Sequence, residues 1–176
     1  MIGDEIYKFA KELWPINRSI TGEGVRETLQ RISKHLPALE IQSIPSGTKV
    51  FDWHVPKEWS VKEAYIITPD GKKICDFSKN NLHIVGYSVP FEGEISFDKL
   101  KNHLYTLADQ PKAIPYVTSY YEERWGFCLT QEQFDTLENG TYKVVINSTL
   151  FEGELNYGEL LIEGKSDKEI FLSTYI

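Results

Sequence analysis

Apolar and polar residues alternate with a helical period at the start of the chain. The apolar residues from Asp4 to Trp14 lie three or four positions apart, and Pro15 closes this segment because proline disfavours helical geometry in the preceding residue. The same period predicts a second helix from about Gly22 to His35, with Thr21 as its N-cap. The sequence therefore predicts two amphipathic helices in succession.

A twofold period replaces the helical one after Pro37 and indicates strands. The clearest hairpin signal is residues 63–77, where Asp70-Gly71 supplies the backbone conformations that a tight turn requires. A final pair of long strands is predicted in residues 138–164, around a turn near Gly153. The other predicted elements are strands near residues 39–44, 50–55, 81–90, 114–120 and 125–130, and short helices at 97–107, capped by Ser96, and at 131–137.

The last apolar run, "SDKEIFLSTYI" (residues 166–176), is typical of a strand buried on both faces. Helices early in the chain and an isolated buried strand late in it suit one α/β layer interrupted by a β-rich insertion. The predicted fold class is α+β. Residues 1–44 and 151–176 are expected to form an incomplete α/β layer, and residues 45–150 an inserted β-rich domain.

Composition and charge narrow the possible partners of this chain. Apolar residues make up 41% of the 176 positions and the formal net charge is −7, with no cluster of Lys and Arg. Nucleic acids and anionic membranes both require concentrated positive charge, so neither is expected as a partner. No stretch approaches the about 20 apolar residues that span a bilayer, and no export signal is visible, so a cytoplasmic location is expected.

Candidate chemistry is sparse. The four histidines lack paired metal-ligand spacing, no serine lies in a G-x-S-x-G turn, and Cys75 and Cys128 are interpreted as core residues. No catalytic and no metal-binding residue is therefore assigned.

The densest group of polar and aromatic residues is the stretch "YVTSYYEERWGF" (residues 116–127). Its side chains could contact a ligand by stacking and by bidentate hydrogen bonds. The alternative, which we favour, is a strand corner whose aromatic rings close the edge of a core while its arginine pairs with a carboxylate. The candidate contact residues are Tyr120, Tyr121, Glu122, Arg124 and Trp125.

Longer motifs carry a resemblance to a known family. The stretch "NYGELLIEGKSDKEIFLSTYI" resembles the hairpin of co-catalytic zinc aminopeptidases that precedes their first metal-binding histidine. With "LWPINRSITGEGVRETL", "PSGTKVFDWHVPKEW" and "YVTSYYEERWGFCL", it makes the whole chain similar to the N-terminal part of a bacterial aminopeptidase-like family of unknown function. That family is often associated with surface-polysaccharide biosynthesis genes.

The resemblance implies an α/β peptidase-like layer with a β-rich domain inserted into it. Family members continue past the position of Ile176 with a Cys-His-Pro segment that holds the first zinc ligand. Zinc is thus implied for the longer members, while no cofactor is expected in this chain. Glu122 and Glu123 precede the first ligand position, so they do not correspond to the family's catalytic acids.

The resemblance predicts a non-catalytic N-terminal region of a zinc aminopeptidase-like hydrolase, and leaves enzymatic activity of this chain undecided. The alternative is a freestanding β-rich module that binds a peptide or glycan. The expected partner is the remainder of the peptidase-like domain, or a second copy through the predicted strand 170–176. On that strand Phe171, Leu172, Tyr175 and Ile176 are expected to be partly exposed.

Overall fold

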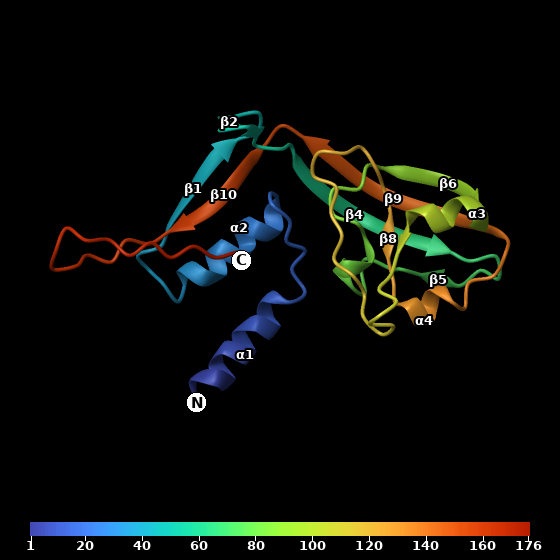
Figure 1. The fold of residues 1–176 in the computed structure, drawn as a ribbon, viewed down its shortest axis with the longest axis horizontal. Helices are drawn as coiled ribbons and strands as arrows, with labels where there is room; N and C mark the ends of the chain where they lie inside the picture. Colours follow the sequence, from blue (N-terminus) through green and yellow to red (C-terminus); the bar gives the residue numbers. More distant parts are fainter. The chain divides into compact units, whose positions relative to one another are not determined.

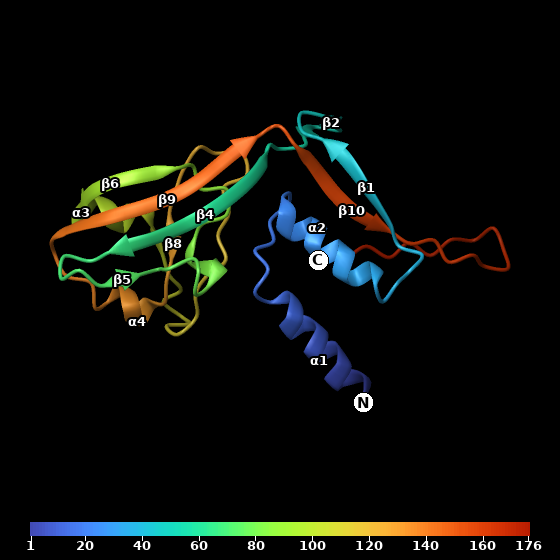
Figure 2. The same ribbon diagram turned by 180° about the vertical axis from the view of Figure 1, so that it is seen from behind.

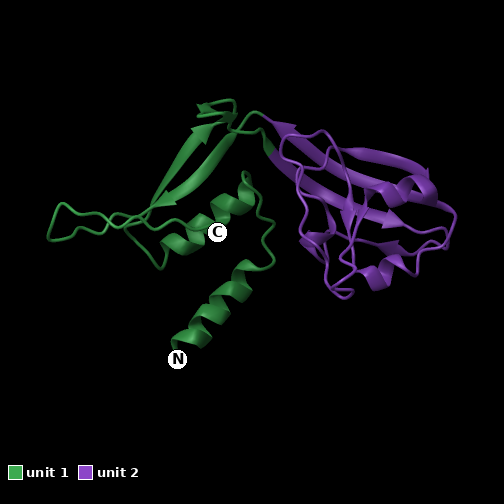
Figure 3. Ribbon diagram, viewed as in Figure 1, with its two compact units in different colours: residues 1–58, 152–176 green, residues 59–151 purple.

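The structure, a computed structural model, describes all 176 residues and divides them into two compact units. Unit 1 comprises residues 1–58 and 152–176, and unit 2 comprises residues 59–151 (Figure 3). Both contain small sheets and few helices, which confirms a mixed fold of helices and strands. The sequence placed the divisions at 44/45 and 150/151, and the existence of two separate domains stays a prediction.

Unit 1 is built from two helices and two small antiparallel sheets (Figure 1). Residue Ile44 of the larger sheet lies opposite Leu155, so two segments far apart in the sequence form one ladder. The elements are α1 (Ile2–Leu13), α2 (Glu23–Ser33), β1 (Glu40–Pro45) paired with β10 (Glu154–Glu159), and β2 (Lys49–Val50) paired with β3 (Trp53–His54).

Helix α2 packs its apolar face on strand β10. Val25 and Leu29 are buried, and a Cβ atom added to Gly158 would lie 3.1 Å from Leu29 Cδ2, so the strand approaches the helix closely at this glycine. The predicted N-cap was wrong: Gly22, with φ 108°, holds the cap position, while the Thr21 hydroxyl donates to the Lys57 carbonyl. The Thr21 side chain therefore makes a tertiary hydrogen bond instead of capping the helix.

Helix α1 confirms the predicted period, but none of its residues is buried. Ile2, Ile6 and Tyr7 are exposed, and the Phe9 ring meets the His35 ring edge-on at 4.8 Å. Periodicity predicted where this helix lies in the sequence and not what its apolar stripe covers.

Unit 2 contains a four-stranded sheet in the order β5-β4-β9-β6 and a parallel pair of short strands (Figure 2). The elements are β4 (Glu58–Ile67), β5 (Lys73–Ile74), β6 (Phe91–Ser96), β7 (Leu104–Tyr105), β8 (Phe127–Cys128) and β9 (Thr141–Phe151), the helices α3 (Phe97–Leu100) and α4 (Gln131–Phe134), and 3₁₀ turns at Asn81–His83 and Lys101–His103.

Alternating side chains explain the sheet of unit 2. Strand β6 exposes Glu92 and Glu94 and half-buries the residues that alternate with them, while the neighbouring strand β9 buries Tyr142 and the run from Val144 to Ile146. The predicted hairpin between β4 and β5 is confirmed. In its turn, Gly71 has φ 83°, a conformation that glycine adopts without steric cost.

Three predicted strands are replaced by other structure. Residues 114–120 form only an isolated bridge at Thr118. Residues 81–90 form a 3₁₀ turn and isolated bridges at Ile84 and Gly86, because their backbone partners come one at a time from separate segments. Residues 50–55 are the tip and one arm of the β2–β3 hairpin, where Phe51 stands in a left-handed conformation with φ 52° and is 92% exposed.

The predicted buried strand at residues 170–176 was wrong. This segment forms no helix or strand, and Phe171, Leu172 and Tyr175 are exposed, as is part of Ile176. Strand β10 pairs with β1 instead of turning back to pair with the last residues. An apolar segment forms a strand only where another strand satisfies its backbone groups, and residues 1–159 supply none to it.

The chain leaves unit 1 at Glu58 and returns to it at residues 152–153. The two passages touch, because a Cβ atom on Gly153 would lie 2.7 Å from Glu58 Cβ, and the Gly153 amide donates to Ser46 Oγ at 3.1 Å. Adjacent entry and exit points are the geometry that accommodates an inserted segment.

Replacing Gly153→Ala is expected to destabilise unit 1 by about 1–3 kcal/mol, since the new methyl group overlaps Glu58 and must displace it. Urea denaturation followed by circular dichroism would measure the change. The control is Gly3→Ala, where nothing lies within 4 Å of the added atom. Equal stability of the two variants would contradict the close passage.

Limited trypsin digestion is expected to cut first after Lys165 and Lys168, in a segment without helix or strand, and to leave a fragment containing residues 59–151. Mass spectrometry of a digestion time course would identify the fragments. Cleavage after Lys99 or Lys143 at a comparable rate would contradict an independently stable unit 2.

Candidate functional site

The segment of residues 114–126 in unit 2 carries the candidate contact residues. It is anchored to the backbone of residues 84–89, because the Gly86 amide donates to the Val117 carbonyl at 2.8 Å and the Ser119 amide donates to the Gly86 carbonyl at 2.9 Å. A Cβ atom on Gly86 would lie 3.3 Å from Thr118 Cγ2, so the small residue permits this close approach.

Arg124 is held by the segment itself. Its Nη2 atom donates to the Thr118 carbonyl at 2.7 Å, its Nη1 atom lies 3.6 Å from a Glu122 carboxylate oxygen, and its guanidinium lies 5.9 Å from the centre of the Tyr105 ring. Glu122 and Glu123 are both exposed. The arginine therefore pairs with a carboxylate of its own loop, as the structural interpretation of this stretch expects.

Trp125 belongs to a stack of half-buried rings. Its ring stacks on Phe91 with centroids 4.3 Å apart and on His103 at 3.7 Å, and the His103 Nδ1 atom hydrogen-bonds the Trp125 carbonyl oxygen at 3.0 Å. The neighbouring Gly126 has no room for a side chain, since a Cβ atom would lie 2.8 Å from the His103 carbonyl oxygen. This half of the candidate cluster closes the edge of the core of unit 2.

Tyr120 faces a second group of rings. Its ring meets Tyr87 edge-on at 5.0 Å, and its hydroxyl lies 3.3 Å from the hydroxyl of Tyr116. Tyr87 is buried, has φ 66° and stacks on Trp59 at 5.8 Å. Sequence reasoning missed Tyr87 and Tyr116, although Tyr116 opens the stretch that was singled out.

The structure thus divides the candidate residues between two surroundings. Tyr120 contacts the other tyrosines, Trp125 lies in the ring stack with Phe91 and His103, and Arg124 with Glu122 lies between them in the sequence. Tyr121 is 65% exposed. The role of these five residues as ligand contacts stays a prediction.

A polar cluster in unit 1 was not foreseen. Arg26 of α2 donates from Nη2 to Glu58 Oε1 at 2.5 Å and from Nη1 to Glu58 Oε2 at 3.1 Å, and also from Nη1 to Asn156 Oδ1 at 3.2 Å. The Glu154 amide donates to Glu58 Oε2 at 3.4 Å, and the more exposed Glu23 accepts from Arg26 Nε. The hydrogen bond from Arg26 lowers the pKa of Glu58, against the desolvation that raises it.

The donor groups of this chain do not assemble a metal site. Among the 176 residues, no three His, Cys, Asp or Glu side chains lie close enough together to hold an ion. Cys75 and Cys128 are buried free thiols, and desolvation raises the pKa of each to about 12. These residues do not fit the zinc centre that the resemblance implies for longer proteins.

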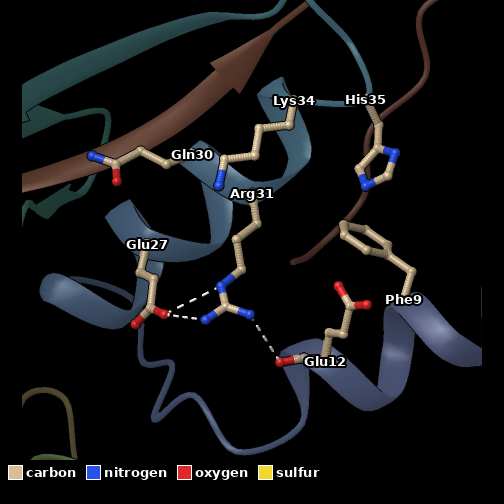
Figure 4. Close-up of a pocket in the computed structure, with 7 residues that line it drawn as sticks. All are labelled: Phe9, Glu12, Glu27, Gln30, Arg31, Lys34 and His35. Atoms are coloured by element: carbon tan, nitrogen blue, oxygen red, sulfur yellow. Dashed lines mark hydrogen bonds and ion pairs between the residues drawn. The ribbon is translucent and has the colours of Figure 1, made fainter.

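A hollow of about 300 Å³ lies between α1 and α2 (Figure 4). Arg31 pairs with Glu27 at 2.6 Å and donates to the Glu12 backbone carbonyl at 3.4 Å. The hollow is lined by Phe9, Glu12, Glu27, Gln30, Arg31, Lys34 and His35.

Fold and site together define a two-unit protein whose second unit is an aromatic-rich sheet domain. The chain belongs to the family described as "Domain of unknown function (DUF2172)", whose pattern matches residues 58–149. The match covers unit 2 almost completely.

Comparison with individual proteins points to peptidase-like relatives. The chain is 53% identical over 173 residues to a Clostridium acetobutylicum protein named "Putative polysaccharide biosynthesis protein with aminopeptidase-like domain", covering 98% of this chain and 40% of the relative. A crystal structure described as a "putative peptidase" from Clostridium acetobutylicum superimposes with a TM-score of 0.84 at 54% identity, covering 89% of this chain and 37% of that one. The resemblance to aminopeptidase-like proteins of unknown function is confirmed at this coarse level, and the chain spans about two fifths of the length of these relatives.

No helix of the structure has the length and hydrophobicity needed to cross a membrane.

The depressed pKa of Glu58 predicts an acid-sensitive unit 1. A carboxylate whose folded-state pKa is below its ordinary 4.5 contributes stability that is present above pH 4.5 and lost as the pH falls through the folded-state value. Glu58→Gln is expected to cost about 3 kcal/mol at pH 7, because it leaves the Arg26 charge without its buried partner, and to flatten this acid limb.

Denaturant titrations at several pH values would measure both effects. The control is Glu23→Gln, which removes the other carboxylate of Arg26 from a position that is mostly exposed and is expected to cost at most about 1 kcal/mol. An unchanged acid limb in Glu58→Gln would contradict the assignment.

Proposed function

We propose that this chain is the non-catalytic N-terminal region of an aminopeptidase-like protein. In this proposal unit 1 contributes part of a peptidase-like α/β layer, and unit 2 is a domain inserted into that layer which shapes access to the site. The observation that carries the proposal is the similarity of 98% of the chain to only 40% of a protein named for an aminopeptidase-like domain.

The small interior of unit 1 supports its role as part of a larger layer. Its buried apolar side chains are few: Ile16, Val25, Leu29 and Val55. Large apolar side chains of the same unit are exposed on α1 and in residues 161–176. Exposure of many large apolar side chains is typical of a contact with further protein. We propose the remainder of the peptidase-like domain as that contact, in preference to self-association through the last residues.

The adjacent passages at Glu58 and Gly153 support the insertion. A segment whose ends lie side by side can be removed without separating the strands β1 and β10 that flank it. Zinc and the catalytic base belong, in this proposal, to the part of the longer protein that this chain does not match.

The test uses the full-length Clostridium acetobutylicum relative. The residues that align with 59–151 are replaced by a short Gly-Ser linker, and folding, zinc content and hydrolysis of a short aminoacyl chromogenic substrate and of a longer peptide are compared. We expect a folded protein with unchanged zinc content and a severalfold change in the ratio of the two rates, because the inserted domain limits access to the site.

The control carries the same linker between the positions that align with Phe151 and Glu152, without a deletion. An unfolded deletion variant would contradict the separate inserted domain, and an unchanged ratio of rates would contradict its influence on access. A zinc-loaded relative that cleaves neither substrate would contradict the aminopeptidase-like activity.

A further inference from the structure

The turn that leads into strand β9 contains an asparagine followed by a glycine, Asn139-Gly140, and no other asparagine of the chain precedes a glycine. Both residues are exposed and lie outside the helices and strands. The amide nitrogen that follows an asparagine can attack the side-chain carbonyl carbon and close a succinimide ring. A following glycine favours this closure, because it has no Cβ atom to shield its nitrogen.

The reaction needs only water as a co-reactant. The Gly140 amide nitrogen loses its proton and bonds to the Asn139 Cγ atom, and the side-chain nitrogen leaves as ammonia. Water then opens the ring. Breaking the bond from the ring nitrogen to Cγ gives aspartate, and breaking its bond to the main-chain carbonyl carbon gives isoaspartate, in which the main chain runs through the side chain. In both products an amide has become a carboxylate, which is ionised at neutral pH.

The peptide group between Asn139 and Gly140 is not held by hydrogen bonds, although both of its neighbours are. On one side, the Tyr142 hydroxyl donates to the Glu138 carbonyl at 2.8 Å. On the other side, the Phe97 amide donates to the Gly140 carbonyl at 3.0 Å. The Asn139 side chain, the Asn139 carbonyl and the Gly140 amide make no hydrogen bond within the protein. Rotation of this peptide group toward the Asn139 side chain therefore breaks none.

The hairpin turn between β4 and β5 offers a comparison, because Asp70 precedes Gly71 there and could cyclise by the same route. In that turn the Gly71 amide donates to the Thr68 carbonyl at 2.9 Å, and the Thr68 hydroxyl donates to the Asp70 carboxylate. The latter hydrogen bond lowers the pKa of Asp70 and keeps its carboxyl group ionised. A carboxylate is a poor target for a nucleophile, so this site is expected to react slowly.

A second comparison is Asn147, which is also exposed but precedes Ser148 inside strand β9. The Ser148 hydroxyl donates to the Ser88 carbonyl at 2.7 Å, which fixes the residue that would supply the attacking nitrogen. Intramolecular attack requires the reacting atoms to approach to about 3–3.5 Å in the correct alignment, and a fixed extended strand opposes that approach. Exposure of the asparagine alone therefore does not select the site.

Isoaspartate at position 139 would disturb the start of strand β9. It adds a methylene group to the main chain between the Glu138 and Gly140 carbonyls, both of which are held. The space beside Gly140 is already filled, because a Cβ atom there would lie 2.5 Å from Pro69 Cγ. The longer main chain must therefore break one of these two hydrogen bonds or displace Pro69. One of the bonds comes from Tyr142, which is 1% exposed and belongs to the core of unit 2.

We propose that Asn139 is a site of spontaneous deamidation and that the isoaspartate formed there loosens the entry into strand β9. Three observations carry the proposal: the exposed Asn139-Gly140 pair, the absence of hydrogen bonds on the peptide group that reacts, and the held carbonyls on both sides of it. This inference does not depend on the peptidase-like function proposed above.

The test uses the full chain, kept in mildly alkaline buffer at body temperature and sampled over several weeks. Peptide mass spectrometry with electron-transfer fragmentation, which distinguishes isoaspartate from aspartate, locates the products. We expect Asn139 to convert about tenfold or more faster than Asn147 or Asp70, because the reacting atoms of the latter two are fixed or deactivated. Mildly acidic buffer is expected to slow the conversion of Asn139, since the Gly140 amide must lose its proton.

Stability is measured on the isoaspartate form after chromatographic separation. We expect it to melt about 3 °C or more below the fresh protein, whereas freshly prepared Asn139→Asp, which has the charge without the added methylene, melts with the fresh protein. The matched control for ageing is Asn139→Gln, which keeps an exposed amide but would have to form a larger ring, and is expected to keep its melting temperature during the incubation.

Three results would each overturn the proposal. The first is conversion of Asn139 no faster than that of Asn147. The second is a loss of stability in Asn139→Gln that matches the loss in the unaltered chain, and the third is an isolated isoaspartate form that melts at the same temperature as the fresh protein.

Discussion

The bidentate pair between Arg26 and Glu58 is the interaction on which unit 1 depends. It joins helix α2 to the point where the chain leaves the unit, and through Asn156 and the Glu154 amide it also holds the strand on which the chain returns. Because the interior of unit 1 contains few apolar side chains, removing one partner of this buried pair affects a large share of its stability. In unit 1 this cluster of polar groups connects helix α2 to both passages of the chain, a role that an apolar core has in most domains.

Unit 2 is organised differently, around aromatic rings and an alternating sheet. Strand β9 buries Tyr142, Val144 and Ile146, and ring contacts lead from this interior to the surface in two directions, through Trp125 and through Tyr87. This unit has an interior of its own. The family match to residues 58–149 coincides with that interior.

The candidate ligand residues show how far composition can locate a site. The sequence singled out Tyr120, Tyr121, Glu122, Arg124 and Trp125 because they are dense in polar and aromatic groups. The density of such groups does not reveal which rings pack against other side chains. The Trp125 ring stacks on Phe91 and His103. The Tyr120 ring contacts Tyr87, which lies 33 positions earlier in the chain. A contact between positions so far apart leaves no local pattern in the sequence.

The sequence by itself determined what depends on neighbouring residues: the helical period of α1 and α2, the glycine turn between β4 and β5, and the long strand β9. Tertiary structure decided the partners. It paired β10 with β1 instead of with the last residues, directed the Thr21 side chain to Lys57, and brought Arg26 to Glu58. The physical reason is that local geometry is fixed by the sterics and periodicity of adjacent residues, whereas strand pairing and buried ion pairs depend on which distant groups are available to satisfy them.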